Sequence, residues 1–204
     1  MNPLHLLRPT CLMLLASPVV ASAGALVVSV TDSTGKPLPD AVVLLEPATG
    51  KAPVKPLPDA EISQAKRQFQ PRVTVVTVGT KVAFPNFDTV RHHVYSFSTA
   101  KTFELKLYAG VPAAPIVFDK PGLVTLGCNI HDRMAAWVVV ADTPWFARSG
   151  GDGVARIDDG PAGAYRLSAW HPGLGAGGAA PARAVQLGNA EQREALKLAV
   201  ENAP

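Results

Sequence analysis

The sequence predicts an all-β fold made of two β-sandwiches, one inserted into the other. Short runs of β-branched and aliphatic residues recur along the chain, and turns containing Gly and Pro separate them, as in β-sandwiches. A Pro-rich stretch at 47–60 and a looser composition from Thr143 onward set off a middle block. We therefore expect 24–60 and 143–204 to form one small sandwich from both ends of the chain, with 61–142 inserted as the other. A single enlarged sandwich is the alternative.

The first 23 residues predict an export signal. A short leading region with Arg8 precedes an apolar run from Cys11 to Val20, and Ala21-Ser22-Ala23 forms a small-residue cleavage site. We expect a periplasmic protein of about 180 residues, enough for one large or two small domains. The full chain carries 19 basic and 16 acidic residues, and loss of Arg8 would leave 18 − 16 = +2. This small charge, with no basic stripe, argues against a nucleic-acid partner. No later apolar run reaches the roughly 18 residues that span a membrane.

The two end segments carry the expected strands of the first sandwich. Two aliphatic runs flank a turn at 32–39, which predicts a pair of strands. Asp152-Gly153 is typical of a hairpin turn, and 158–161 indicates another. In the last run, Leu196, Leu198 and Val200 share one face. The strands expected here are 26–30, 41–46 and 196–200, with a Gly/Ala-rich loop at 173–182.

The middle block carries stronger strand signals. Phe103, Leu105 and Leu107 alternate with charged residues, which predicts a half-buried strand. One strand leads into Cys128 and another follows Met134, so both ends of the loop between these residues would be anchored. The strands expected are 73–78, 81–84, 94–97, 103–107, 116–118, 123–126 and 137–140.

The loop between Cys128 and Met134 offers three metal-ligand side chains in the pattern Cys128-x2-His131-x2-Met134. Without 1–23, the chain retains one Cys, one Met and four His residues. An unpaired Cys in an exported protein has no internal disulfide partner, so another role is needed. The plain alternative is a buried thiol beside a methionine that fills the core. The sulfur and imidazole set instead indicates a trigonal copper site of two His and one Cys with a weak axial Met.

The second imidazole has to come from another part of the chain. His92 and His93 are available on an extended segment about 35 residues upstream. Adjacent residues of a strand point to opposite faces, so only one of the two can readily enter the site. The residue pattern by itself leaves both open.

These motifs resemble the cupredoxins. Residues 84–94, which read Phe-Pro-Asn-Phe-Asp-Thr-Val-Arg-His-His-Val, and 127–134 carry the likeness, and the short Cys-to-Met loop is most similar to amicyanin. Over roughly 25–175 the chain also resembles exported bacterial proteins labelled methylamine utilization or plastocyanin-like, through 95–97, 103–108 and 170–172. Segments 35–44 and 162–172 are similar to carboxypeptidase regulatory-like β-sandwich domains.

The resemblance implies a cupredoxin Greek-key β-sandwich at 61–142 with one type 1 copper. It assigns His92, Cys128, His131 and Met134 as the ligands. The Cys128 thiolate would dominate the electronic structure of the copper centre, and Met134 would tune its reduction potential. Two features, which involve three positions, depart from the family pattern. Ile130 and Asp132 flank His131 where amicyanin-type loops usually carry Pro, and His93 stands where Asn commonly follows the first ligand.

Several other residues are weaker candidates for a functional role. His171 is expected to pack or form a hydrogen bond at a strand end, and the tryptophans are expected in the core or between domains. The acidic residues Asp152, Asp158 and Asp159 lack the alternation of a calcium loop and are expected in turns. Arg91, Arg133 and Lys101 are candidates for a charged rim around the site, with ordinary solvated surface charge as the default interpretation.

An enzyme is disfavoured, because only His93 and His171 remain once His92 and His131 are used. A copper oxidase cluster or a three-His copper needs more imidazoles. The expected function is single-electron transfer between a redox-protein donor and acceptor. The alternatives are a periplasmic copper carrier that does not cycle the metal, and an interaction module with a vestigial site.

Overall fold

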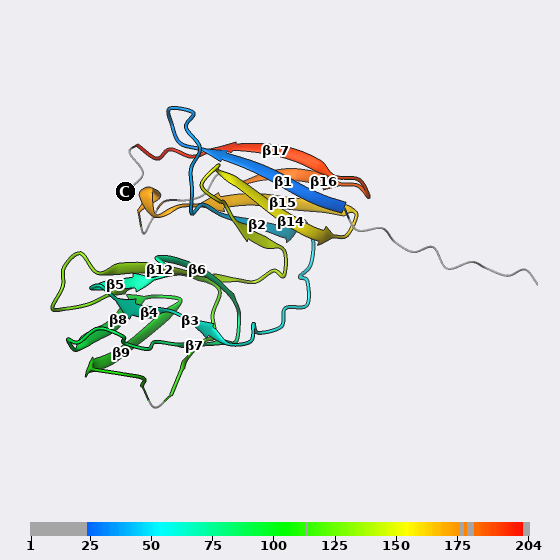
Figure 1. Cartoon of the computed structure of the whole chain (residues 1–204). Coiled ribbons are helices and arrows are strands. Elements are labelled where there is room, and N and C mark those ends of the chain that lie inside the picture. Colours follow the sequence, from blue (N-terminus) through cyan, green and yellow to red (C-terminus); the bar gives the residue numbers. More distant parts are fainter. Residues whose placement is uncertain (1–23, 113, 176–177, 179–181, 202–204) are drawn as a thin grey trace, which may run out of the picture.

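The computed structural model describes residues 24–112, 114–175, 178 and 182–201, and its regular structure is almost entirely β-strand (Figure 1). The strands form two β-sandwiches, so the predicted all-β class is confirmed. Among the described residues the single helix is the short 3-10 turn η1 (Pro172–Leu174), and no helix there is long and apolar enough to span a membrane. The expected export signal, 1–23, lies outside the described residues.

One sandwich combines strands from the two ends of the chain (blue, yellow and red in Figure 1). In one sheet, β1 (Gly24–Thr31) lies between antiparallel β14 (Val154–Gly160) and parallel β17 (Gln192–Lys197). The facing sheet has the order β13 (Phe146–Arg148), β2 (Val42–Pro47), β15 (Gly163–Trp170) and β16 (Ala182–Leu187). A single apolar core fills the space between them, with Leu26, Leu45 and Leu167 fully buried.

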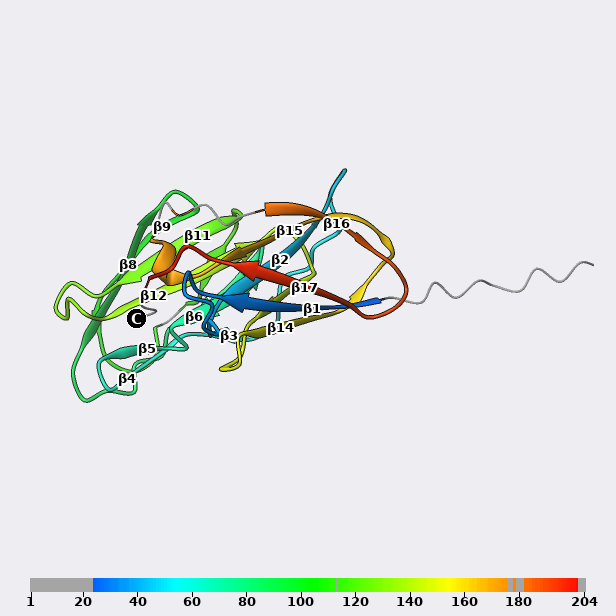
Figure 2. The same cartoon turned by 90° about the horizontal axis from the view of Figure 1, so that it is seen from above.

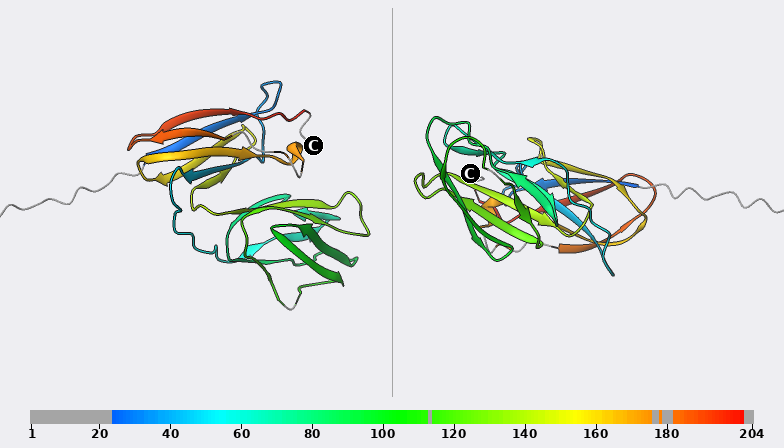
Figure 3. Two further views of the ribbon diagram at one scale, coloured as in Figure 1. Left: turned by 180° about the vertical axis from the view of Figure 1, so that it is seen from behind. Right: turned by 90° about the horizontal axis from the view of Figure 1, so that it is seen from below.

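The other sandwich uses the strands between β2 and β13. Its larger sheet has the order β6 (Val73–Thr77), β12 (Ala135–Ala141), β11 (Gly122–Gly127), β8 (His92–Ser98) and β9 (Lys101–Tyr108). A smaller sheet contains β10 (Ile116–Phe118), β7 (Thr80–Ala83) and β3 (Ala60–Glu61), and β4 (Ser63–Ala65) pairs with β5 (Gln68–Gln70) in a hairpin. Its separate core includes Phe84, Phe118 and Leu126. The chain crosses between the sandwiches after β2 and after β12 (Figure 3).

The sandwiches contact each other through the outer face of the five-stranded sheet. Val138 and Val140 of β12 face the inner core, whereas Trp137 and Val139 pack against Trp170. This strand is apolar on both faces because both are covered, which explains its uninterrupted run of valines. Arg148 also donates a hydrogen bond to the Val73 carbonyl at 3.1 Å. Figure 2 shows that β1 begins at the end of its sandwich farthest from β8 and β9.

One strand prediction needs correction, and one hairpin was not predicted. The last strand is Gln192–Lys197 rather than 196–200, because parallel pairing with β1 ends where β1 ends, at the Thr31–Lys197 pair. Leu196, Leu198 and Val200 are nevertheless all buried, as their shared face predicts. The β4–β5 hairpin was not predicted, because its strands are rich in Gln, Ser and Ala. It is held instead by tertiary burial of Gln64 and Phe69.

Candidate metal centre

Three side chains from two distant segments converge at one end of the second sandwich. The Nδ1 atom of His92 lies 3.9 Å from the Cys128 Sγ atom, and the Nδ1 atom of His131 lies 3.7 Å from it. The three ligand atoms all lie within 4.8 Å of one another, and the two imidazole centroids are 4.9 Å apart. His92 and Cys128 are buried, while His131 is partly exposed. Two of the three ligand candidates are therefore buried, and His131 is the one that is partly exposed to solvent.

Strand pairing brings these residues together. Cys128 follows β11 directly and Met134 directly precedes β12, and the Gly127–Ala135 pair closes the loop between them. Gly127 also pairs with Tyr95 of β8, the strand that begins at His92. Inside the loop, the Met134 amide donates a hydrogen bond to the His131 carbonyl at 2.8 Å. Both ends of the loop and His92 are therefore held by one sheet.

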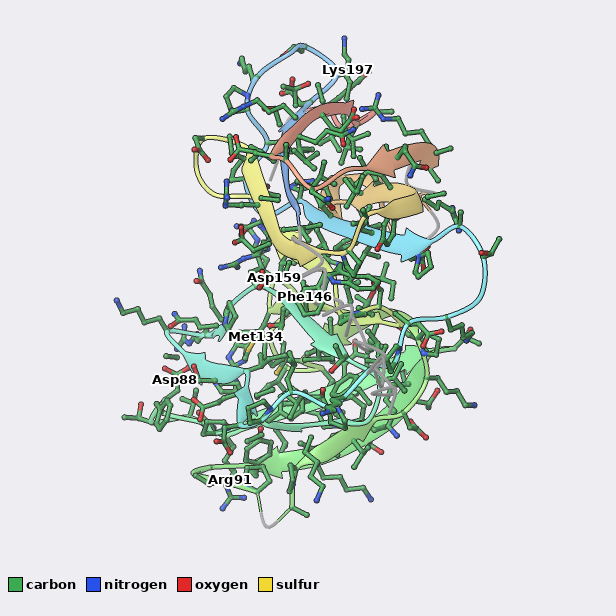
Figure 4. The ribbon with its side chains drawn as sticks, turned by 90° about the vertical axis from the view of Figure 1, so that its right-hand side faces the viewer. Asp88, Arg91, Met134, Phe146, Asp159 and Lys197 are labelled. Carbon is green, nitrogen blue, oxygen red and sulfur yellow. The ribbon has the colours of Figure 1, made fainter. Side chains whose placement is uncertain are left out.

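Met134 lies beside this group. Its side chain is buried in the same core cluster as Cys128, and both residues line one groove at the surface. Figure 4 shows Met134 and Asp88 at the same end of the second sandwich. The thioether of Met134 is therefore buried in the same cluster as the Cys128 thiol. The assignment of all four residues as copper ligands remains a prediction.

The His92 ring is oriented by Asp88. The His92 Nε2 atom lies 2.8 Å from Asp88 Oδ2, so the ring directs its Nδ1 atom toward Cys128. The same carboxylate accepts hydrogen bonds from the backbone amides of Lys66 and Arg67, at 2.7 and 2.8 Å. Partial burial acts to raise the pKa of Asp88, but the hydrogen bonds from Arg67, His92 and Lys66 outweigh it and lower the pKa. The carboxylate stays ionised at neutral pH and favours the Nε2–H tautomer of His92.

The sequence did not identify Asp88 as a residue of the site. It precedes His92 by four residues on a loop, where no periodicity links the two side chains. Its anchoring amides lie more than 20 residues upstream, in the turn of the unpredicted β4–β5 hairpin. The only signal in the sequence was an acidic residue near a candidate ligand, and that signal is common and unspecific.

A buried polar cluster supports the loop that carries Asp88. The Asn86 side chain donates to the carbonyls of Val90 and Tyr108, both at 2.9 Å, and accepts from the Asp88 amide at 2.9 Å. The Tyr108 hydroxyl donates to the Phe84 carbonyl at 2.6 Å and is contacted by the Gln64 amide nitrogen. Burial is the main cause that raises the pKa of Tyr108 to about 12, so it remains a donor. This cluster joins the 84–90 segment to β9 and leaves little freedom at His92.

His93 does not enter the site. Its Nε2 atom lies 2.9 Å from Glu104 Oε1 on β9, and its ring packs against Tyr95 with centroids 5.3 Å apart. The ring is buried by these contacts on the face opposite to His92. His171 caps η1, where its Nδ1 atom accepts from the Gly173 amide at 3.0 Å, and burial lowers its pKa. Neither residue belongs to the group around Cys128.

The acidic turn residues and Lys101 lie outside the group around Cys128 and interact with other residues. Asp152 accepts from the Val154 amide in its turn, and Asp158 pairs with Arg156. Lys101 was a candidate for the rim of the site, and the structure contradicts this. The β8–β9 hairpin pairs Ser98 with Lys101 at its turn and His92 with Tyr108 at its other end, so Lys101 lies far from the site. It forms an ion pair with Asp119 instead.

Comparison with known proteins finds structural neighbours only. No family model matches the chain, and no curated protein matches its sequence. A reduced Cu(I) form of an amicyanin mutant at pH 4 aligns with 20% identity over 43% of this chain and 92% of its own, with a TM-score of 0.38. A purple cupredoxin from Nitrosopumilus maritimus aligns with 23% identity over 41% of this chain and 100% of its own, with a TM-score of 0.36. Likenesses this partial assign no function, so the side chains of the site have to carry the argument.

Proposed function

We propose that this chain is a type 1 copper protein that transfers single electrons between two redox-protein partners. One copper per chain would be held by His92, Cys128, His131 and Met134. The observation that carries the proposal is the convergence of His92 Nδ1, His131 Nδ1 and Cys128 Sγ within 4.8 Å, in a mostly buried pocket. Two imidazoles, one thiolate and a nearby thioether are the ligand set that copper electron-transfer sites use.

The hydrogen bonding of His92 and the softness of the ligand atoms also fit copper. A histidine ligand needs one nitrogen free and is usually held by a hydrogen bond from the other. His92 meets this condition, because Asp88 holds its Nε2 atom and its Nδ1 atom faces the Cys128 sulfur. A soft thiolate and borderline imidazoles select a thiophilic metal over magnesium or calcium, which prefer oxygen ligands.

The protein would contribute a rigid set of ligands, one of which, His131, is partly exposed. Copper, when bound, supplies a one-electron change between its +1 and +2 states. Cys128, His92 and the loop ends are fixed by β8, β11 and β12, so the ligand atoms need little movement when the charge of the metal changes. His131 is the ligand that reaches the surface, which makes its ring the shortest exit toward a partner.

We also propose the domain organisation and setting of this site. Residues 61–142 would form a cupredoxin domain inserted between 24–60 and 143–204, which would form a carboxypeptidase regulatory-like sandwich. Two separate apolar cores support this division. The chain would be exported to the periplasm through 1–23, as in the methylamine utilization type that it resembles. It would carry electrons without catalysing a reaction, because His92 and His131 occupy half of the four histidines that remain after 1–23.

The proposal is tested by titrating the metal-free mature protein with Cu(II) and recording its visible spectrum. One equivalent should produce an intense thiolate-to-copper charge-transfer band. The reduced protein is then mixed with an excess of a Cu(I) chelator and reoxidised through repeated cycles. Retention of copper and colour supports an electron carrier, because the pocket is formed by strand pairing before the metal arrives. Rapid loss of copper from the folded protein would support the copper-carrier alternative, and absence of the band would refute the type 1 site.

A further inference from the structure

Four basic side chains surround the candidate metal centre without acidic partners. Lys66 and Arg67 form the turn of the β4–β5 hairpin, Arg91 directly precedes His92, and Arg133 directly precedes Met134. All four are exposed. Within 24–112, 114–175, 178 and 182–201, none of them forms an ion pair.

The arginines of the other sandwich differ in this respect. Every arginine described after Arg133 is paired with a carboxylate. The pairs are Arg148–Asp40, Arg156–Asp158, Arg156–Glu191, Arg166–Glu46, Arg183–Glu194 and Arg193–Glu191. Within the described part of the chain, the arginines of that sandwich are therefore neutralised locally, although its lysines Lys36 and Lys197 form no ion pair, whereas three arginines and one lysine at the metal-binding end are left without one. Of the nearby carboxylates, Asp88 is engaged by His92 and two backbone amides and Glu104 by His93, whereas Asp132 is exposed on the ligand loop.

Three exposed apolar side chains lie on the loops that carry or adjoin these charges. Phe87, Val111 and Ile130 are 67%, 70% and 48% exposed. The Phe87 amide donates to the Gln64 carbonyl beside the basic hairpin, and the Asn86 amide donates to the Gly110 carbonyl, which places Val111 next to the same loop. Ile130 directly precedes His131 in the ligand loop. An apolar centre with a charged rim is the usual composition of a protein–protein docking surface.

We propose that this end of the molecule, defined by Lys66, Arg67, Arg91 and Arg133 around Phe87, Val111 and Ile130, docks an acidic redox protein. The inference rests on the proposed function and adds the sign of the partner's charge. Unpaired cations at the edge of an interface raise the association rate with an acidic surface and repel a basic one. A second copy of this chain fits poorly, because it would bring the same four cations together.

The first test measures binding without copper, so that it does not depend on the redox function. The metal-free mature protein is titrated by calorimetry with cytochrome c whose lysines are succinylated, which makes it acidic, and with native basic cytochrome c. We expect the succinylated form to bind more tightly at low ionic strength and to lose affinity as salt rises. Equal binding of both forms, or tighter binding of the native form, would overturn the proposal.

Variants locate the interaction on this surface. Lys66→Gln, Arg91→Gln and Arg133→Gln are combined, and the control combines Lys36→Gln, Lys120→Gln and Lys197→Gln, with the same change of charge. Lys120 precedes β11 and so lies at the opposite end of that strand from Cys128, and Figure 4 shows Lys197 at the far end of the molecule from Arg91. The rim variant should bind the succinylated protein about tenfold more weakly, and the control should bind as the unaltered chain does. Equal loss in both would show that only net charge matters and would overturn the proposal.

A second measurement separates the docking inference from the proposed function. In the copper-loaded, reduced protein, one electron passes to the ferric haem of succinylated cytochrome c, and its rate should fall with rising ionic strength and in the rim variant alone. Binding by the metal-free chain without any copper-dependent electron transfer would leave the docking surface standing and refute the function. Electron transfer at the same rate in the rim and control variants would refute the docking surface and leave the proposed function standing.

Discussion

Asp88→Ala is expected to weaken copper binding without unfolding the chain. The substitution removes the carboxylate that holds the Nε2 atom of His92 at 2.8 Å and that accepts hydrogen bonds from the Lys66 and Arg67 amides. Its side chain is 17% exposed, so water can reach the two amides once the carboxylate is gone. His92 itself is fully buried and has no such replacement at its ring.

The expected losses of folding stability and of copper affinity follow from this difference in access to solvent. A net hydrogen bond to a charged group contributes about 1.5–3 kcal/mol, and rehydration of the two amides recovers part of it, so global stability should fall by about 1–2 kcal/mol. Loss of a group that orients a metal-ligating histidine typically costs about 10–100-fold in metal affinity. That range corresponds to about 1.4–2.8 kcal/mol of binding free energy.

The assay is competition for Cu(II) against a chelator of known affinity, combined with the visible spectrum and urea unfolding of the metal-free protein. Asp132→Asn is the matched control, because it removes a negative charge from the ligand loop and leaves the three hydrogen bonds of Asp88 intact. Asp88→Ala should lose affinity, whereas Asp132→Asn should stay within about twofold. Unchanged affinity in Asp88→Ala would refute the orienting role, and an equal loss in Asp132→Asn would show that charge rather than the hydrogen bond is responsible.

Three further predictions follow from the site and the fold. Cys128→Ser should abolish the intense visible band while circular dichroism remains that of a β protein, and a variant that keeps its colour would remove the thiolate assignment. His92→Ala should lose the type 1 spectrum, whereas His93→Ala should only perturb copper binding, because His93 pairs with Glu104 on the opposite face; the reverse ranking in a copper titration would contradict the orientation of β8. Gly153→Ala should lower the free energy of unfolding by about 2 kcal/mol or more, because its φ is 73° and a Cβ atom would lie 2.6 Å from the Val30 carbonyl oxygen. Gly151→Ala, which has no atom within 4 Å of such a Cβ, should be nearly neutral in the same urea titration.

Much of the secondary structure could be predicted because its signals are local. Phe103, Leu105 and Leu107 all lie in β9, although Leu107 is exposed where the pairing with β8 is irregular, and the β-branched run at 73–78 covers β6. The ends of strands were less predictable. Strand β17 stops at Lys197 although apolar alternation continues to Val200, because pairing with β1 rather than composition determines where a strand ends.

The rest of the site depended on contacts between distant segments. Asp88 and the β4–β5 hairpin carry no strong pattern of their own, yet together they hold His92. Lys101 is close to the ligands along the chain but is removed from them by the register of the β8–β9 hairpin. Neither outcome can be obtained from residue spacing, because each depends on which atoms meet after the strands have paired.

The sequence by itself determined the all-β class, the loop from Cys128 to Met134 and the short list of histidines that could join it. These features depend on residue type and spacing within a few positions, which the chain carries whether or not it is folded. Only the tertiary structure decided which histidine faces Cys128, which carboxylate orients its ring and where positive charge remains unpaired. The physical reason is that the Gly127–Tyr95 pair brings β8 and β11 together across more than 30 residues of chain. A shift of one residue in β8 would turn His93 inward and His92 outward, because side chains alternate between the two faces of a strand.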